Sequence, residues 1–318
     1  MSHPTDICLS DARTLIARAI DKAAHIGARG AFAVVGGSGV LVSASRMDRG
    51  GAGGMARARS KAWISATQQI PSAEHHVRMA TLPPPIAAGF VACSPEANFP
   101  GAGGMPIHDE ADPARPVVGG FSASGATVGP FVSIPGIDRR MLIAQGQPAN
   151  SEDLIVLWAL GLPYVGQHGD DGKRWLDAFG PPLPDEEGLG YGDPPPADQP
   201  EHTWAVSLAN RAIAEAGRRG LRIAIAIVDR RGDPIQQDTM DGAPTAAPFV
   251  AEALGAGAAT FQLPSTEVDP ALTTVLPYRV LTAPGGLPVR DGERVVAGLG
   301  IAGADSSVCE EIAASVLA

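Results

Sequence analysis

The chain has 318 residues, a mass of 32.5 kDa and a formal net charge of −10, with 45% hydrophobic and 18% charged residues. This length suits two domains of ordinary size, and the composition is typical of a globular protein. A pI near 5.1 argues against a nucleic-acid surface, although it permits a local basic pocket for an anionic ligand.

Cysteine usage and the N-terminal segment predict a cytoplasmic protein. The cysteines at positions 8, 93 and 309 are far apart and form no CxxC pair, so we expect neither a zinc site nor a disulfide framework. The N-terminus lacks a basic region followed by an apolar one, so no signal peptide is expected. No apolar run approaches the roughly 18 residues that span a bilayer, so no membrane association is expected.

Taken in chain order, the elements of the first half alternate helices with strands. An apolar stripe predicts a helix over 9–27, and "AFAVVGG" followed by "GVLVSAS" predicts a hairpin that turns at Gly36–Gly39. The remaining predictions are helices over 53–69 and 151–161 and strands near 86–93 and 116–124. An insertion is predicted at about 127–150, and a Pro- and Gly-rich linker at 165–202.

The second half repeats the first. Arg18-Ala19-Ile20 recurs 193 residues later as Arg211-Ala212-Ile213, and the same register still holds where Pro71-Ser72 recurs as Pro264-Ser265. Shorter loops then reduce the offset, because "GGMPI" (103–107) recurs as "GGLPV" (285–289) and "VVGGFSASGA" (117–126) as "VVAGLGIAGA" (295–304). In this second copy we predict a hairpin around Gly232, helices over 246–262 and 306–317, and strands over 275–282 and 294–301.

These elements predict an α+β fold, in which hairpins build an antiparallel sheet and helices cover it. The repeat divides the chain into domain 1 (1–164, with the insertion), the linker (165–202) and domain 2 (203–318), which together form a pseudo-dimer.

The stretch "SASRMDRGGAGG" (43–54) and the helix after it predict an anion site. Glycines at a helix start leave backbone N–H groups for an anion, so Gly53 and Gly54 are candidate ligands. Arg46, Arg57 and Lys61 add basic groups, and Arg57 and Lys61 lie four residues apart on one helix face. The alternative is a solvated basic face.

Acid–base chemistry has three candidates: Lys61, Asp48 and His108. Asp48 is a candidate proton donor or acceptor beside a lysine. However, the second copy keeps this residue as Asp241 while it loses the lysine, which favours a structural role such as helix capping. His108 follows the "GGMPI" turn, and the second copy has Arg290 there.

Other polar residues give weaker signals. His75 and His76 are the only histidine pair, but neighbours in an extended segment point in opposite directions, so a shared metal ion is not favoured over two surface histidines. Gly103 and Gly104 form either a close approach for a ligand or a tight turn. Ser122 and Ser124 share one strand face and are candidate ligand-binding residues. The sequence around them shows no Ser-His-Asp spacing, so a catalytic nucleophile is not favoured.

The ordered set of motifs resembles the GlcG/HbpS-type family of haem-associated proteins. The matching segments are "RMD" (46–48), "SKAWISA" (60–66), "IPSAEH" (70–75), "GGMPI", "VVGGFSASGA" and "SEDL" (151–154), most of which have echoes in the second copy. The resemblance implies a profilin-like fold, homo-oligomers, and binding of haem or another small anionic molecule beside catabolic enzymes. It also implies an Asp that closes the first hairpin strand, present as Asp229 in copy two but replaced by Gly36 in copy one, so Asp229 is a further candidate ligand-binding residue.

Three functional hypotheses follow. The first is a protein that binds haem or a small anionic metabolite, mainly through copy one, because copy two has Thr239 and Leu254 in place of Arg46 and Lys61. The second is an enzyme without an organic cofactor, a lyase, hydrolase or isomerase that acts on a small carboxylated metabolite. The third is a structural assembly protein.

Overall fold

The computed structural model forms two compact units. Unit 1 comprises residues 1–40 and 49–198, and unit 2 comprises residues 41–48 and 199–318. The structure describes residues 6–94, 96–99, 101–127, 143–144, 147–165 and 194–318.

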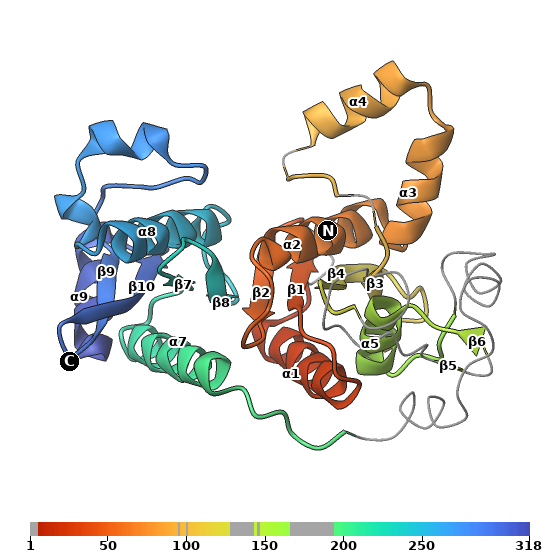
Figure 1. The fold of residues 1–318 in the computed structure, drawn as a ribbon, viewed down its shortest axis with the longest axis horizontal. Coiled ribbons are helices and arrows are strands. Elements are labelled where there is room, and N and C mark those ends of the chain that lie inside the picture. Colours follow the sequence, from red (N-terminus) through yellow and green to blue (C-terminus); the bar gives the residue numbers. More distant parts are fainter. Residues whose placement is uncertain (1–5, 95, 100, 128–142, 145–146, 166–193) are drawn as a thin grey trace. The chain divides into compact units, whose positions relative to one another are not determined.

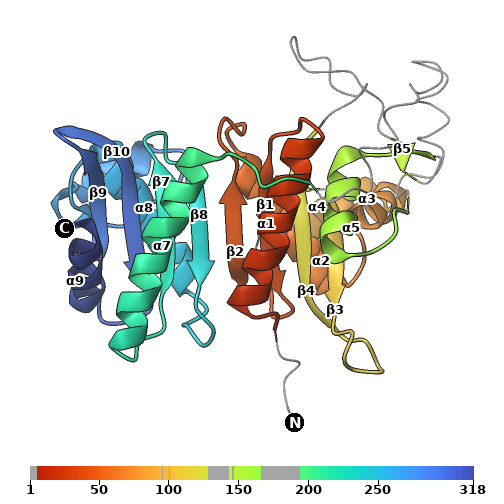
Figure 2. The ribbon, with the colours of Figure 1, turned by 90° about the horizontal axis from the view of Figure 1, so that it is seen from below.

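Unit 1 is built on an antiparallel sheet with strand order β3-β4-β1. Helix α2 covers one face of the sheet and α1 and α5 cover the other, while α3 and α4 extend away from it (Figures 1 and 2). Its elements are α1 (Leu9–His25), β1 (Ala31–Gly36), α2 (Gly54–Gln68), α3 (Ser72–Thr81), α4 (Pro84–Cys93), β3 (Gly104–His108), β4 (Val117–Ser124), β5 (Ile143–Ala144), β6 (Gln147–Pro148) and α5 (Ser151–Leu160).

Unit 2 is a sheet with order β2-β8-β7-β10-β9, in which α8 covers one face and α7 and α9 the other (Figure 2). Strand β2 comes from the first sequence copy but pairs with β8, where Ala44 lies opposite Gln237. The elements are β2 (Leu41–Arg46), α7 (Pro200–Arg218), β7 (Ala224–Asp229), β8 (Pro234–Thr239), α8 (Ala247–Phe261), the 3₁₀ segments η2 (Ser265–Glu267) and η3 (Pro270–Val275), β9 (Gly286–Asp291), β10 (Arg294–Ala302) and α9 (Ser306–Leu317).

Backbone packing between sheet and helix is unusually close in both copies. Gly120 of β4 faces α2, and a Cβ added to it would lie 2.1 Å from the carbonyl oxygen of Ala62. In copy two a Cβ on Gly298 would lie 2.1 Å from the carbonyl oxygen of Gly255. Glycine at these two strand positions therefore sets the distance between the helix and the sheet.

The predicted α+β class and antiparallel sheets are confirmed, and the predicted helices match the observed ones to within two residues at each end. The insertion at 127–150 and the linker at 165–202 lie largely outside the described residues, although α7 begins inside the predicted linker, at Pro200. The domain boundaries stay a prediction.

Two predicted strands are wrong. Residues 86–93 belong to the helix α4, whose first residues, Pro84 and Pro85, preset helical φ angles. A short apolar run has no periodicity that separates a strand from a helix. Residues 275–282 follow a 3₁₀ segment and form no strand, since Pro277 cannot donate to a ladder. The edge strands β3 and β9 begin instead at the two glycine turns.

Asp6 supplies the carboxylate that the sequence pattern lacks at Gly36. In copy two, Asp229 accepts a hydrogen bond from the backbone N–H of Arg231 at 2.8 Å. In copy one, Asp6 accepts the corresponding bond from the N–H of Ser38 at 3.0 Å and a second from the Ser38 hydroxyl at 2.5 Å. A Cβ added at Gly36 would lie 2.8 Å from the Asp6 carboxyl carbon, so the glycine leaves room for it.

This replacement predicts a rescue. Asp6→Gly should lower the free energy of unfolding by about 1 kcal/mol, because the Ser38 N–H loses its acceptor at an exposed turn. Adding Gly36→Asp to that variant should restore most of the loss, since it rebuilds the arrangement at Asp229. Urea unfolding of the wild type and both variants checks this, and a double variant no more stable than the single one would contradict it.

Candidate functional site

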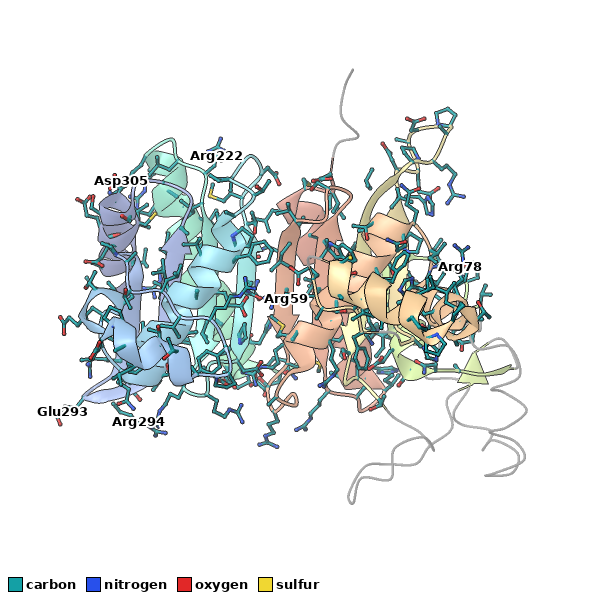
Figure 3. All side chains as sticks on the ribbon, turned by 90° about the horizontal axis from the view of Figure 1, so that it is seen from above. Arg59, Arg78, Arg222, Glu293, Arg294 and Asp305 are labelled. Atoms are coloured by element: carbon teal, nitrogen blue, oxygen red, sulfur yellow. The ribbon has the colours of Figure 1, made fainter. Side chains whose placement is uncertain are left out.

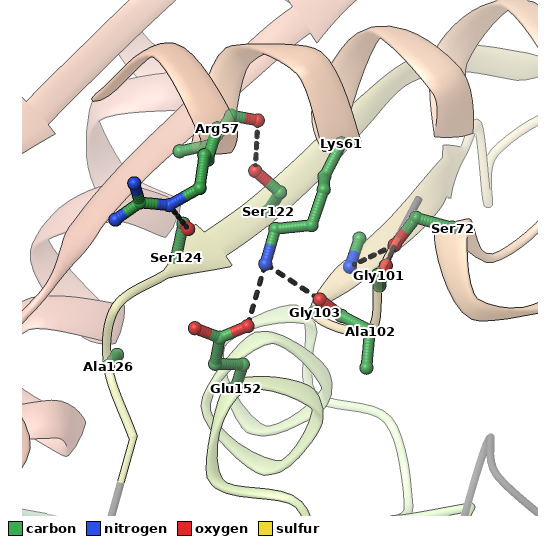
Figure 4. A network of polar contacts seen from close by, with 12 residues as sticks. Arg57, Lys61, Ser72, Gly101, Ala102, Gly103, Ser122, Ser124, Ala126 and Glu152 are labelled. Atoms are coloured by element: carbon green, nitrogen blue, oxygen red, sulfur yellow. Dashed lines mark hydrogen bonds and ion pairs between the residues drawn. The ribbon is translucent and has the colours of Figure 1, made fainter. Parts of the chain in front are cut away.

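A buried ion pair lies between α2 and α5 of unit 1 (Figure 4). The ammonium Nζ of Lys61 is 2.6 Å from Oε2 of Glu152 and also donates to the carbonyl oxygen of Ala102 at 2.7 Å. Lys61 is only 1% exposed and Glu152 is 8% exposed. Asn150 positions the glutamate, because its side chain accepts hydrogen bonds from the first N–H groups of α5 and so fixes where that helix begins.

Next to this pair, a serine and a carboxylate hold a turn in both copies. Asp153 accepts a hydrogen bond from the N–H of Gly103, and Ser72 accepts one from the N–H of Gly104. Ser72 also donates to the carbonyl oxygen of Gly101. The corresponding residues of copy two repeat all three bonds: Glu310 with Gly285, Ser265 with Gly286, and Ser265 with Ala283. These contacts therefore belong to the fold.

The rest of the cluster is polar in copy one and apolar in copy two. Around the shared turn, a Cβ added at Gly103 would lie beside Glu152, whereas one added at Gly285 would lie beside Leu254 and Cys309. The residues of copy one and their counterparts in register are Arg57 and Val250, Ser60 and Ala253, Lys61 and Leu254, Ser65 and Ala258, His75 and Val268, Ser122 and Gly300, and Ser124 and Ala302. One fold therefore builds this region in two ways, and only copy one places a lysine and a histidine in it.

The predicted ligands Ser122 and Ser124 both lie on β4 under α2 (Figure 4). Ser122 donates to the carbonyl oxygen of Ala58 at 2.5 Å, and the Nε of Arg57 lies 3.4 Å from the hydroxyl of Ser124. Gly53 has a left-handed φ of 73° and precedes α2, which begins at Gly54, one residue after the predicted start.

Arg46 lies in unit 2, and its guanidinium is paired. Its Nη2 is 2.8 Å from Oδ2 of Asp229, and its Nε donates to the carbonyl oxygen of Pro234 at 3.1 Å. Burial alone would raise the pKa of Asp229, but hydrogen bonds from Arg231 and the charge of Arg46 hold that pKa below its ordinary value. Two residues expected to bind a ligand thus bind each other.

Asp48 and His108 each have a contact away from Lys61. The carboxylate of Asp48 accepts hydrogen bonds from the N–H groups of Glu201 and His202, in the first turn of α7. Asp48 therefore caps a helix, but this helix is α7 and not the loop or helix directly after Asp48, where the sequence placed the role. His108 ends β3, whereas Lys61 lies beside the residues just before that strand, and the Nδ1 of His108 contacts the carbonyl oxygen of Arg115 at 2.8 Å.

The two adjacent histidines lie on α3, so the expectation of an extended segment is wrong. His76 is exposed, but His75 is 4% exposed, and its Nε2 has no hydrogen-bond partner among the described residues. Burial lowers the pKa of His75 below its ordinary value, against a hydrogen bond with Asn98 that raises it. Its ring lies 6.4 Å from that of Phe90 on α4.

Within the described ranges, no group of three or more His, Cys, Asp or Glu side chains is placed to hold a metal ion. No described helix combines the length and the apolar character that a membrane span requires.

Sequence reasoning found Lys61 but missed its partner Glu152, because the two are 91 residues apart. The segment "SEDL" points to this region, since it is one of the ordered motifs and contains both Glu152 and Asp153, but it does not show which residue either one contacts.

Fold and site together define a tandem α+β protein in which one repeat carries a buried polar cluster. A family model described as "Haem degrading protein HbpS-like" matches residues 7–129 and 201–318. These ranges make up more than half of the chain, with one on each repeat. The chain therefore belongs to the HbpS-like family of haem degrading proteins.

Several solved structures are similar to one part of the chain. ORFY of Klebsiella pneumoniae is 20% identical, with a TM-score of 0.35 over 36% of this chain and 86% of its own. A double mutant of HbpS from Streptomyces reticuli is 26% identical, with a TM-score of 0.34 over 40% and 95%. A PduOC complex with haem is 23% identical, with a TM-score of 0.32 over 35% and 86%. No curated protein has a significant match to this chain.

Proposed function

We propose that unit 1 binds haem, as an accessory to a catabolic pathway. The observation that carries the proposal is the difference between the copies: copy two keeps the shared turn but replaces Lys61 and His75 with Leu254 and Val268. A fold that tolerates apolar residues at these positions does not need the charged ones for stability, so a ligand is the reason to keep them. Membership in a haem degrading family supports haem as that ligand.

A titration of the full chain with ferric protoporphyrin IX, followed by visible absorption, tests the proposal. We expect a saturable Soret change that reaches its end point at one equivalent per chain, because only copy one carries Lys61 and His75. An absent change would contradict haem binding, and an end point at two equivalents would contradict the assignment to copy one.

A second candidate is an enzyme that acts on a small carboxylated metabolite. The contact between Lys61 and Glu152 favours it, because a buried amine and carboxylate 2.6 Å apart are placed to exchange a proton. A substrate carboxylate would compete with Glu152 for the ammonium. Turnover of a small carboxylate that needs no added haem, and that is lost in Lys61→Leu, would favour this candidate over haem binding. Homo-oligomers and a cytoplasmic location stay predictions of the sequence.

A further inference from the structure

The buried Nε2 of His75, which has no hydrogen-bond partner in the part of the chain that the structure describes, needs a physical explanation. A buried polar atom left without a hydrogen bond is destabilising, because it has lost its hydrogen bonds to water without replacement. Copy two avoids that cost with Val268, which is also buried. Copy one therefore keeps a destabilising nitrogen where an apolar side chain fits, which points to a ligand for that nitrogen.

The helix beside His75 is apolar and uncovered. Helix α4 has no charged residue and no buried side chain, and among its large residues Ile86 is 56% exposed and Phe90 46%. Val77 of α3 and Phe99 are also exposed, so the chain offers large apolar side chains to solvent before, within and after α4. Apolar side chains gathered in this way mark a binding surface. Charge lies elsewhere on α3, where Arg78 points outward and pairs with Glu74 (Figure 3).

We infer that His75 is the axial ligand of the haem iron and that α4 covers the face of the porphyrin. The inference rests on the proposed function. Neutral imidazole is a common haem ligand, and a porphyrin brings four nitrogens of its own, so the protein needs to add only one. This agrees with a single buried histidine in a region whose described residues form no larger set of metal ligands.

Access to the nitrogen depends on α4. The Nε2 atom is covered in the structure, and the ring of Phe90 on α4 lies 6.4 Å from the imidazole of His75. No side chain of α4 is buried, so little packing energy holds the helix in place and its displacement costs little. Once α4 has moved aside, a porphyrin can bind at His75. The helix then covers the porphyrin face, and this contact buries Ile86 and Phe90.

The test compares His75→Val, which copies Val268, with His76→Val on the neighbouring exposed residue. We expect the wild type and His76→Val to show the Soret signature of imidazole ligation. His75→Val should lose that signature and bind ferric haem about tenfold or more weakly. Iron-free protoporphyrin, followed by fluorescence, should bind the wild type and His75→Val with the same affinity. It has no iron, so the loss of an iron ligand does not affect its binding.

A second variant guards against misfolding. His75→Gly with added imidazole should regain the signature, since the free ligand enters the space left by the side chain. If wild type and His75→Val bind haem with the same spectrum, the inference is overturned while haem binding stands. If the wild type itself shows no saturable change, the proposed function fails and the inference fails with it.

Discussion

Replacing Lys61 with Leu is expected to destabilise unit 1 by about 3–5 kcal/mol, whereas Lys61→Leu combined with Glu152→Cys should restore stability. The single change leaves the Glu152 carboxylate buried without its partner, which is the costly way to break a buried pair. The double change recreates the apolar pair of copy two, Leu254 and Cys309. Exchange of a buried ion pair for apolar residues is commonly neutral or stabilising.

The two variants separate stability from function. The double variant should unfold within about 1 kcal/mol of the wild type in urea and should lose or weaken the ligand binding proposed for unit 1. Glu152→Cys alone is the matched control, because it leaves the Lys61 ammonium, instead of the Glu152 carboxylate, buried without its ion-pair partner. A double variant as unstable as Lys61→Leu would show that the pair holds the fold. A stable double variant with unchanged binding would show that the Lys61–Glu152 pair takes no part in ligand binding.

The same comparison shows what could be predicted from the sequence. The repeat alone identified Lys61 as a residue that copy two had replaced, and periodicity predicted the helix that carries it. Glu152 could not be predicted as its partner, because only the packing of α5 against the sheet brings together residues 91 positions apart. The turn at Gly103 was predicted, but the strand that follows it was not.

Arg46 shows a second limit. Its residue type and position predicted an anion site, but β2 pairs with β8, and this pairing brings Arg46 to Asp229. No local pattern specifies which strand lies at a sheet edge and which pairs with the other repeat. His75 was named but not favoured over a surface histidine for a related reason, since an extended segment was expected and α3 formed instead.

Gly120→Ala is the other substitution with a large expected effect. A Cβ at this position would lie 2.1 Å from the carbonyl oxygen of Ala62 and 2.5 Å from the backbone nitrogen of Ala66. Both atoms belong to the backbone of α2, whose inner residues are buried, so no rotamer change relieves the overlap. The helix must move off the sheet, which we expect to cost at least about 3 kcal/mol.

Gly89→Ala on α4 is the control, because nothing lies within 4 Å of its added Cβ. It should stabilise the helix slightly, by about 0.5–1 kcal/mol, since alanine is the better helix former. Thermal and urea unfolding would measure both variants. Because α2 carries Lys61, a folded Gly120→Ala protein should also bind ligand more weakly. If Gly120→Ala is as stable as the wild type, α2 can move off the sheet at little cost in free energy. The site that includes Lys61 would then be less rigid than the buried Lys61–Glu152 contact implies.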